Sequence, residues 1–253
     1  MLEQPDSIEQ KAGKKMRDNS ILVKGAEKIG IVLSEKQQQQ FETYYDYLVS
    51  QNEVMNLTAI TEYEEVLTKH FLDSLFLIQT MKDFEGKKVL DLGTGAGFPG
   101  IPLKIAFPNT EFVLMDSLNK RVAFLNRVIE LLDLKKVTAV HGRAEEVART
   151  KEYREQFDFC VSRAVARLAT LSEFCIPFVK PGGYFISYKA GDCKEECAEA
   201  KNAITTLGGK LLSAKESCLP DTEIARTFVV IRKEKHTPEK YPRGQGKPLK
   251  QPL

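Results

Sequence analysis

The sequence has few cysteines and no long hydrophobic run. Five cysteines in 253 residues are too few for a disulfide-rich scaffold, and their odd number beside a polar N-terminus indicates reduced thiols. No segment approaches the ~18 consecutive apolar residues of a membrane-spanning helix. Residues 1–20 also lack the apolar core of a secretory signal. We therefore expect a cytoplasmic chain of globular composition that does not enter a membrane.

The sequence also lacks an excess of charge of either sign. Its 37 basic and 35 acidic residues leave a net charge of +2, which by itself argues against a nucleic-acid partner. Residues 232–253, however, hold seven basic and two acidic residues, a net +5 that leaves −3 for the rest. Four prolines in this basic tail predict an extended strap without helix. Two interpretations stay open: a solvated end, or an arm in which Arg243, Lys247 and Lys250 contact an RNA phosphate backbone.

Cysteine spacing offers one candidate metal site. Cys193 and Cys197 lie four residues apart and would share one face of a helix. A zinc site needs a second pair of ligands, and the sequence shows none beside them, so we favour packing and expect no metal. Cys160 falls inside a predicted strand, and we assign it to the core rather than to a nucleophile.

We divide the chain into a flexible N-terminus (1–20), a helical N-terminal region (21–84), an α/β domain (85–232) and a basic, proline-containing C-terminal tail (233–253). Two Ser/Thr-x-x-Gln/Glu capping boxes, at Ser34 and Thr61, predict helix starts in the helical region. Behind the first box, apolar residues recur with the spacing of one helix face.

Short β-rich segments alternate with helical ones from residue 85 onward. The predicted strands are Lys88–Leu92, Phe112–Met115, Val137–Val140, Phe157–Val161, Tyr184–Tyr188, Gly209–Ser217 and Thr227–Arg232. The predicted helices are Phe98–Ala106, Leu118–Leu132, Ala144–Arg149, Leu168–Val179 and Lys194–Leu207. The alternation predicts a parallel sheet covered on both faces, and the last two strands form an antiparallel hairpin. A seven-stranded, mostly parallel sheet of this kind is typical of the Rossmann-like class I methyltransferase fold.

A glycine-rich segment follows the first strand, where open α/β sheets bind their ligands. Gly95, Gly97 and Gly100 satisfy the dinucleotide pattern G-x-G-x-x-G, which is weak by itself. Read instead as Asp-x-Gly-x-Gly-x-Gly from Asp91 through Gly93, the loop carries a carboxylate. That carboxylate would repel a pyrophosphate and attract the sulfonium and ammonium of S-adenosylmethionine (SAM). We therefore favour SAM over NAD.

Other candidate residues follow the later strands. Asp116 ends the second strand and can accept both hydroxyl hydrogens of a ribose. Ala144 and Glu145 follow the third strand, where a main-chain N–H and a short polar group can read an adenine. Arg163 ends the fourth strand as a cofactor contact, a donor to guanine O6, or a structural ion-pair partner. Lys189, just past the fifth strand, is a second substrate-facing cation.

The candidate site lacks a recognisable acid–base apparatus. Guanine N7 needs none, because it carries no proton and has a free lone pair. Alignment of the reacting atoms and exclusion of water would suffice for its methylation. The pattern therefore fits N7 methylation without proving it.

Six motifs in sequence order resemble the RsmG (GidB) family. They are Asn52-x-x-x-Asn56-Leu57-Thr58, Lys69-His70-Phe71-x-Asp73-Ser74, the run from Gly93 to Pro102, the run from Asp116 to Arg121, Arg143-Ala144-Glu145, and the run from Ser162 to Ala166. Members of this family are bacterial SAM-dependent methyltransferases of small-subunit ribosomal RNA. They methylate guanine N7 in the 530 loop of 16S RNA, at position 527 in conventional RNA numbering.

The resemblance implies a set of contacts. For the cofactor these are Gly93, Phe98 (through its main chain), Asp116, Ala144, Glu145 and Arg163, beside Asp91, Gly95 and Gly97 from the loop itself. The resemblance leaves the roles of Asn56, His70, Lys120 and Arg121 open. Lys120 and Arg121 lie at a predicted helix start beside the pocket, where RNA phosphate contact and helix capping or packing are equal alternatives. With Lys189, which its position past the fifth strand suggests, and the tail residues, they complete the candidate RNA contacts.

The resemblance also implies a partner, 16S RNA or the small ribosomal subunit, and we expect a monomer. Three alternatives remain. The first is a SAM-dependent methyltransferase of another RNA, a protein or a small molecule; the second is an NAD-binding module; the third is a protein that binds RNA without catalysis.

Overall fold

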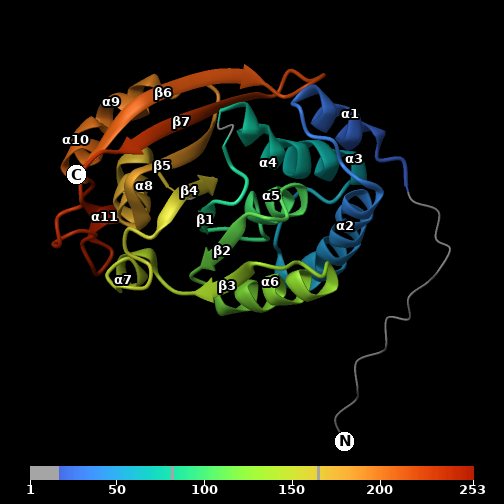
Figure 1. Cartoon of the computed structure of the whole chain (residues 1–253), viewed down its shortest axis with the longest axis horizontal. Coiled ribbons are helices and arrows are strands. Elements are labelled where there is room, and N and C mark those ends of the chain that lie inside the picture. Colours follow the sequence, from blue (N-terminus) through green and yellow to red (C-terminus); the bar gives the residue numbers. More distant parts are fainter. Residues whose placement is uncertain (1–16, 81–82, 164–165) are drawn as a thin grey trace, which may run out of the picture.

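A computed structural model describes residues 17–80, 83–163 and 166–253. Its strands form one sheet in the order β3-β2-β1-β4-β5-β7-β6 (Figure 1). Their bounds are β1 Lys88–Leu92, β2 Glu111–Asp116, β3 Val137–His141, β4 Phe157–Arg163, β5 Val179–Ala190, β6 Gly209–Cys218 and β7 Ala225–Lys233. The pairs from β3 to β5 are parallel, and β7 is antiparallel to both β5 and β6. The predicted sheet, including its closing hairpin, is confirmed.

Helices cover both faces of this sheet (Figure 1). On one face lie α5 (Gly100–Ala106), α6 (Asn119–Leu131) and the N-terminal helices. On the other lie α7 (Ala144–Val147), α8 (Leu168–Cys175) with the 3-10 turn η3 (Ile176–Phe178), α9 (Lys194–Glu199) and α10 (Lys201–Thr206). Within the described ranges, no helix combines the length and apolar character needed to cross a bilayer.

The N-terminal helices share one hydrophobic core with the sheet. They are α1 (Ser20–Lys28), α2 (Glu35–Met55), α3 (Tyr63–Val66), the π-helix η1 (Leu67–Leu72), α4 (Asp73–Leu75) and the 3-10 turn η2 (Phe76–Gln79). Their apolar side chains, including Phe41 and Phe71, pack in the same cluster as Val89 of β1. The predicted flexible N-terminus falls largely in residues 1–16, outside the described ranges.

One predicted capping box is present and the other is wrong. Ser34 caps α2, with its side chain accepting from the Gln37 N–H and the Gln37 side chain accepting from the Ser34 N–H. Thr61 does not cap α3, which begins after Glu62 and has no side-chain cap. The Thr61 carbonyl instead accepts a hydrogen bond from the Tyr45 hydroxyl on α2. Thr61 thus takes part in a tertiary contact and not in a local capping box.

The C-terminal tail is folded against the α8 face rather than extended throughout, which corrects the predicted strap. It contains a short helix, α11 (Lys247–Lys250), with Pro248 in its first turn, where a missing N–H leaves no hydrogen bond broken. Arg149 donates to the Pro242 carbonyl at 2.5 Å, and Arg154 donates to the Tyr241 carbonyl at 2.9 Å. These bonds fix the path of the tail across the domain.

Candidate cofactor and substrate site

The glycine loop leaves the carboxyl end of β1 in a conformation that requires glycine. Gly93, Gly95 and Gly97 have φ values of 71°, 62° and 103°, in the left-handed region where a Cβ is strained. The Gly93 N–H donates to the Met115 carbonyl of β2 at 2.8 Å, which ties the loop to the neighbouring strand. The loop is therefore a rigid turn at the edge of the sheet where β1, β2 and β4 end.

Asp91 lies fully buried beneath this loop. Its Oδ2 accepts hydrogen bonds from the Thr94 hydroxyl at 2.6 Å and the Gly100 N–H at 2.7 Å. Gly100 allows this approach, because a Cβ there would lie 2.8 Å from the same oxygen. The other oxygen, Oδ1, is buried without a hydrogen-bond partner among the described residues. An orphaned carboxylate oxygen is costly unless a cation reaches it, so Asp91 fits the ammonium of a bound SAM.

Burial also changes the acidity of this group. It raises the pKa of Asp91 from 3.8 to about 7, although the bonds from Thr94 and Gly100 oppose the shift. The carboxyl is therefore partly protonated near neutral pH when the site is empty. A cationic ligand would favour its ionised form.

Asp116 closes the loop from β2. Its Oδ2 accepts from the Gly95 N–H at 3.0 Å and from Arg121 at 3.3 Å, and its Oδ1 accepts from the Leu118 N–H at 2.9 Å. The side chain is 3% exposed and lines a cavity at the carboxyl end of the strands. Asp116 therefore positions the glycine loop and faces the space where a ribose is predicted.

That cavity has a volume of about 280 Å³ and collects several predicted residues. Its lining is Leu92, Gly93, Met115, Asp116, Ser117, Gly142, Arg143, Ala144, Glu145, Phe174, Gly246 and Leu249. Phe98 does not line it; its ring packs against His70 and Tyr44 under the N-terminal helices. The sequence predictions missed Phe174, Gly246 and Leu249, because nothing local marks α8 or the tail as a cavity wall.

Arg163 is held by an ion-pair cluster beside the loop. It donates to Asp73 Oδ2 at 3.0 Å, and its guanidinium lies 5.0 Å from the centre of the Phe98 ring. Arg226 of β7 donates to Asp73 Oδ1 at 2.7 Å, so one buried carboxylate joins β4, α4 and β7. The structural interpretation of Arg163 is therefore realised. Sequence reasoning missed Asp73 as its positioning residue, although Asp73 lies inside the Lys69–Ser74 motif.

His70 lies next to this cluster on the π-helix η1. Its ring stacks on Phe98 with centroids 4.5 Å apart, and its Nε2 lies 2.7 Å from the Thr58 hydroxyl. Burial, and secondarily Arg163, lowers the pKa of His70 to about 4, so the ring is neutral at pH 7. The Asn52 side chain accepts from the Thr58 N–H, and Asn56 ends α2 with φ 50°. The Asn52–Thr58 motif thus holds Thr58 against His70.

Comparison with known proteins assigns this chain to a family. The model for GidB, described as rRNA small subunit methyltransferase G, matches residues 37–225. The chain belongs to this family. It is 58% identical to "Ribosomal RNA small subunit methyltransferase G" of Lachnoclostridium phytofermentans, over 94% of this chain and 98% of that protein. It is 52% identical to the protein of the same name from Alkaliphilus metalliredigens, over 94% and 100%.

Solved structures agree on the fold of this GidB-family chain. One is a chain of the Haloferax volcanii complex between the Trm112 methyltransferase activator and a methyltransferase (TM-score 0.55, 14% identity, 76% of this chain and 98% of that one). Another is TrmN from Thermus thermophilus (TM-score 0.50, 16% identity, 66% and 53%). The fold is therefore the Rossmann-like methyltransferase fold predicted from the sequence.

The residues predicted to contact RNA fall into two groups. Three have protein partners: Lys189 pairs with Glu196 at 2.6 Å, Arg121 with Asp116 at 3.3 Å, and Arg243 with Glu173 at 2.7 Å. The other three are exposed: Lys120, whose ammonium lies 3.4 Å from the Met55 carbonyl, and Lys247 and Lys250 on α11. Contact of any of them with RNA stays a prediction.

Cys160, Cys193 and Cys197 are buried, as predicted for residues that serve in packing. Cys160 is completely buried in β4, and the buried Cys193 and Cys197 have sulfurs 3.8 Å apart on the α9 side. In the part of the chain that the structure describes, no three His, Cys, Asp or Glu side chains gather as metal ligands. His141 is exposed at the end of β3.

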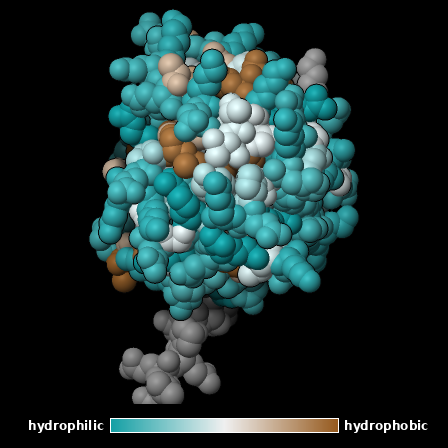
Figure 2. Space-filling model, turned by 90° about the vertical axis from the view of Figure 1, so that its left-hand side faces the viewer, coloured by the Kyte–Doolittle hydropathy of each residue, from teal (hydrophilic) through white to brown (hydrophobic). Residues whose placement is uncertain are grey.

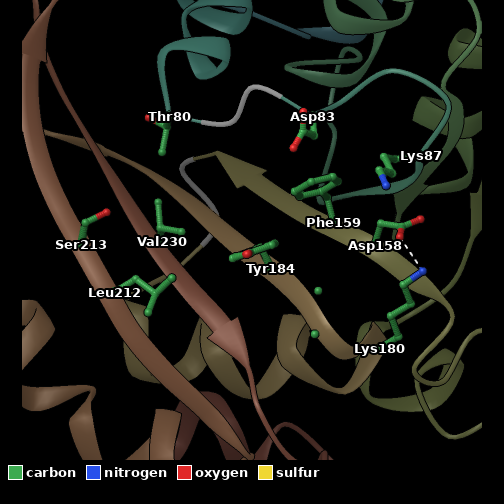
Figure 3. A pocket seen from close by; sticks show the side chains of 12 residues that line it. Thr80, Asp83, Lys87, Asp158, Phe159, Lys180, Tyr184, Leu212, Ser213 and Val230 are labelled. Atoms are coloured by element: carbon green, nitrogen blue, oxygen red, sulfur yellow. Dashed lines mark ion pairs between the residues drawn. The ribbon is translucent and has the colours of Figure 1, made fainter.

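A second cavity, of about 430 Å³, lies at the other end of the strands and holds none of the predicted residues (Figure 3). It lies beside the start of β4 and the first half of β5, with Tyr184 and Val230 on its wall. Asp158 there is bound by Lys180 at 2.5 Å and by the Lys88 N–H at 2.9 Å. Its carboxylate is thus neutralised inside the protein, and the candidate site remains at the carboxyl ends of the strands.

Proposed function

We propose that this protein transfers a methyl group from SAM to small-subunit ribosomal RNA. The observation that carries the proposal is the orphaned, buried Asp91 oxygen beneath a glycine loop that opens onto the cavity at Asp116 and Glu145. Membership of a family described as rRNA small subunit methyltransferases supports the class of acceptor. We further propose guanine N7 in the 530 loop of 16S RNA, at position 527, as the acceptor atom. A monomer in the cytoplasm, where that RNA is found, completes the proposal.

Different residues of this chain would contact different parts of the cofactor. SAM, when bound, supplies a methyl group made electrophilic by its sulfonium. Asp91 would accept the ammonium, Asp116 the ribose hydroxyls, and the Ala144–Glu145 turn would read the adenine. Gly93 lets the main chain come close to the ligand, because no side chain stands in the way. All but Asp91, which lies under the loop, line one cavity.

The acceptor side favours an atom that carries no proton. Burial lowers the pKa of His70 to about 4, so its ring is a weak base, and its Nε2 already contacts the Thr58 hydroxyl. Guanine N7 has no proton to lose. Arg163, oriented by Asp73, could donate to guanine O6, a common arginine contact. Orientation and electrostatics can thus serve where a general base is missing.

Labelled SAM tests the acceptor directly. We expect the purified protein to methylate 30S subunits or 16S RNA that lack this modification, with the label mapping to guanine N7 in the 530 loop. Label on another atom or another loop would overturn the acceptor proposal. Label on a small molecule or protein, with RNA unmodified, would favour a methyltransferase of different substrate class.

The two exposed tail lysines allow a separate test of RNA contact. Replacing Lys247 and Lys250 with alanine should weaken RNA binding and lower the slope of log K against log salt by roughly 1.4 to 1.8, because two phosphate contacts are lost. Filter binding across a range of KCl concentrations measures this slope. Glu239→Ala, an exposed charge change in the same tail, serves as the control. An unchanged slope in the double variant would show that the tail does not contact phosphates.

A further inference from the structure

The C-terminal tail reaches the cavity assigned above to the cofactor. Gly246 and Leu249 form part of its lining, together with Asp116, Ala144 and Glu145. Leu249 lines the cavity and is 63% exposed. Figure 2 shows this side of the molecule as mostly hydrophilic, with only a few separate hydrophobic spots. Leu249 therefore offers apolar surface that the protein itself leaves uncovered.

An ion pair holds the tail in this position. Glu173 of α8 is completely buried and accepts from the Arg243 backbone N–H at 2.7 Å. The Arg243 guanidinium donates to both carboxylate oxygens, with Nη2 at 2.7 Å from Oε2 and Nε at 2.9 Å from Oε1. Thr170, also on α8, donates to the Pro248 carbonyl at 2.9 Å. The tail is thus bound to the same helix that contributes Phe174 to the cavity.

We infer that residues 246–249 form a wall of the adenosine end of the cofactor site, with Leu249 packing on the nucleoside. This inference rests on the proposed SAM site. It assigns the tail a role in cofactor binding in addition to any contact with RNA. It shares the cavity with Asp116 and the Ala144–Glu145 turn, the residues proposed for ribose and adenine. An aliphatic side chain covering a flat aromatic base would bury apolar surface on both.

Calorimetry with S-adenosylhomocysteine and with 5′-methylthioadenosine, in the absence of RNA, tests this wall. Leu249→Ala should weaken both ligands by a similar factor of roughly three to ten, as expected for losing part of one buried leucine. Both ligands carry the adenosine, whereas methylthioadenosine lacks the amino-acid end. Gln251→Ala is the matched control, because Gln251 is exposed in the same tail and does not line the cavity. Its affinities should equal those of the wild type.

The possible outcomes distinguish failure of the proposed SAM site from failure of the proposed tail wall. If the wild type binds neither ligand, the proposed SAM site is wrong. If it binds both and Leu249→Ala binds them equally well, the wall is wrong. If the variant weakens only S-adenosylhomocysteine, placement at the adenosine end is wrong. Thermal unfolding of the ligand-free variant should match the wild type, since Leu249 is mostly exposed; a lowered midpoint would assign the loss to stability instead and overturn the inference.

Discussion

Asp91→Asn is expected to weaken binding of S-adenosylhomocysteine roughly a hundredfold, equivalent to about 2.7 kcal/mol. The asparagine carbonyl can still accept from Thr94 and from the Gly100 N–H, so the loop should keep its shape. The substitution replaces Oδ1, the carboxylate oxygen that has no hydrogen-bond partner within the described residues, by an amide group. An amide N–H₂ in its place would confront the ligand's ammonium with a donor where an acceptor is required.

Calorimetry at pH 8 measures the affinity of Asp91→Asn for S-adenosylhomocysteine. The control is Asp158→Asn, which makes the same substitution near the other end of the strands. The control should bind as the wild type does, because Asp158 lies away from the cofactor cavity. An affinity within threefold of the wild type for Asp91→Asn would exclude the ammonium contact.

The same carboxyl should make ligand binding depend on pH. Its pKa is about 7 in the empty site, whereas its ordinary value is 3.8. Affinity should therefore fall about tenfold per pH unit as the pH drops from 7 to 5, because the protonated acid cannot pair with the ligand's ammonium. His70 has a pKa of about 4 and stays neutral over that range. Asp91→Asn should remove the pH dependence, and a steep dependence in that variant would assign it to another group.

Protonation of Asp91 should affect the stability of the ligand-free protein in the opposite direction, stabilising the fold at low pH while it weakens ligand binding. A pKa raised on folding means that the native state binds the proton more tightly than the unfolded chain does. The stabilisation from this group is therefore complete below about pH 4 and is lost as the pH rises through 7. In the ligand-free protein, Asp91→Asn should raise the free energy of unfolding at high pH but not at low pH. Urea unfolding at both pH values measures this difference.

Arg243→Ala is expected to lower the free energy of unfolding by about 3–5 kcal/mol, the usual cost of leaving a buried charge without its partner. Glu173 is 0% exposed, and its side chain bonds recorded in the structure all come from Arg243. The backbone N–H of residue 243 would remain, but the positive charge would be gone. A solvated or purely RNA-binding tail predicts almost no change in stability.

Urea unfolding of a small set of variants separates these cases. Glu111→Ala breaks the exposed Lys88–Glu111 pair and should cost less than about 1 kcal/mol. Combining Arg243→Ala with Glu173→Leu should recover most of the loss, since removing both partners leaves no buried charge. If Arg243→Ala alone costs no more than Glu111→Ala, the tail is not anchored as the structure shows.

Local sequence signals account for most of the fold. Strands such as Lys88–Leu92 are short apolar runs between turn residues, and a buried parallel strand needs nothing more to be recognised. The Ser34 capping box is satisfied by residues three apart, so no distant contact is needed to realise it. The Thr61 box is wrong: α3 begins at Tyr63 after Glu62, and Thr61 instead meets Tyr45 of another helix through its carbonyl. Boundaries and caps that depend on tertiary partners are therefore the places where prediction from the sequence is weakest.

Charges in the sequence were easy to count and hard to interpret. The tail's seven basic residues left a solvated end and an arm for RNA equally open, yet Lys233 pairs with Glu155 and Arg243 with Glu173. Each partner lies 70 or more residues away, beyond the reach of any local pattern. Glu173 gave one usable signal, because it is the single charged residue in the helix Leu168–Cys175. A buried carboxylate of that kind needs a cation from elsewhere in the chain.

By itself, the sequence determined the order of strands and helices, the glycine loop with Asp91 and Asp116, and the family resemblance. These properties depend on residues close together in the chain, where backbone sterics and hydrophobic periodicity act directly. Tertiary structure alone decided which charges are paired, that Asp73 joins Arg163 to Arg226, and that Leu249 faces the cavity. Such contacts follow from packing elements distant in sequence, because burial makes each charge find a partner and only the folded chain decides which one.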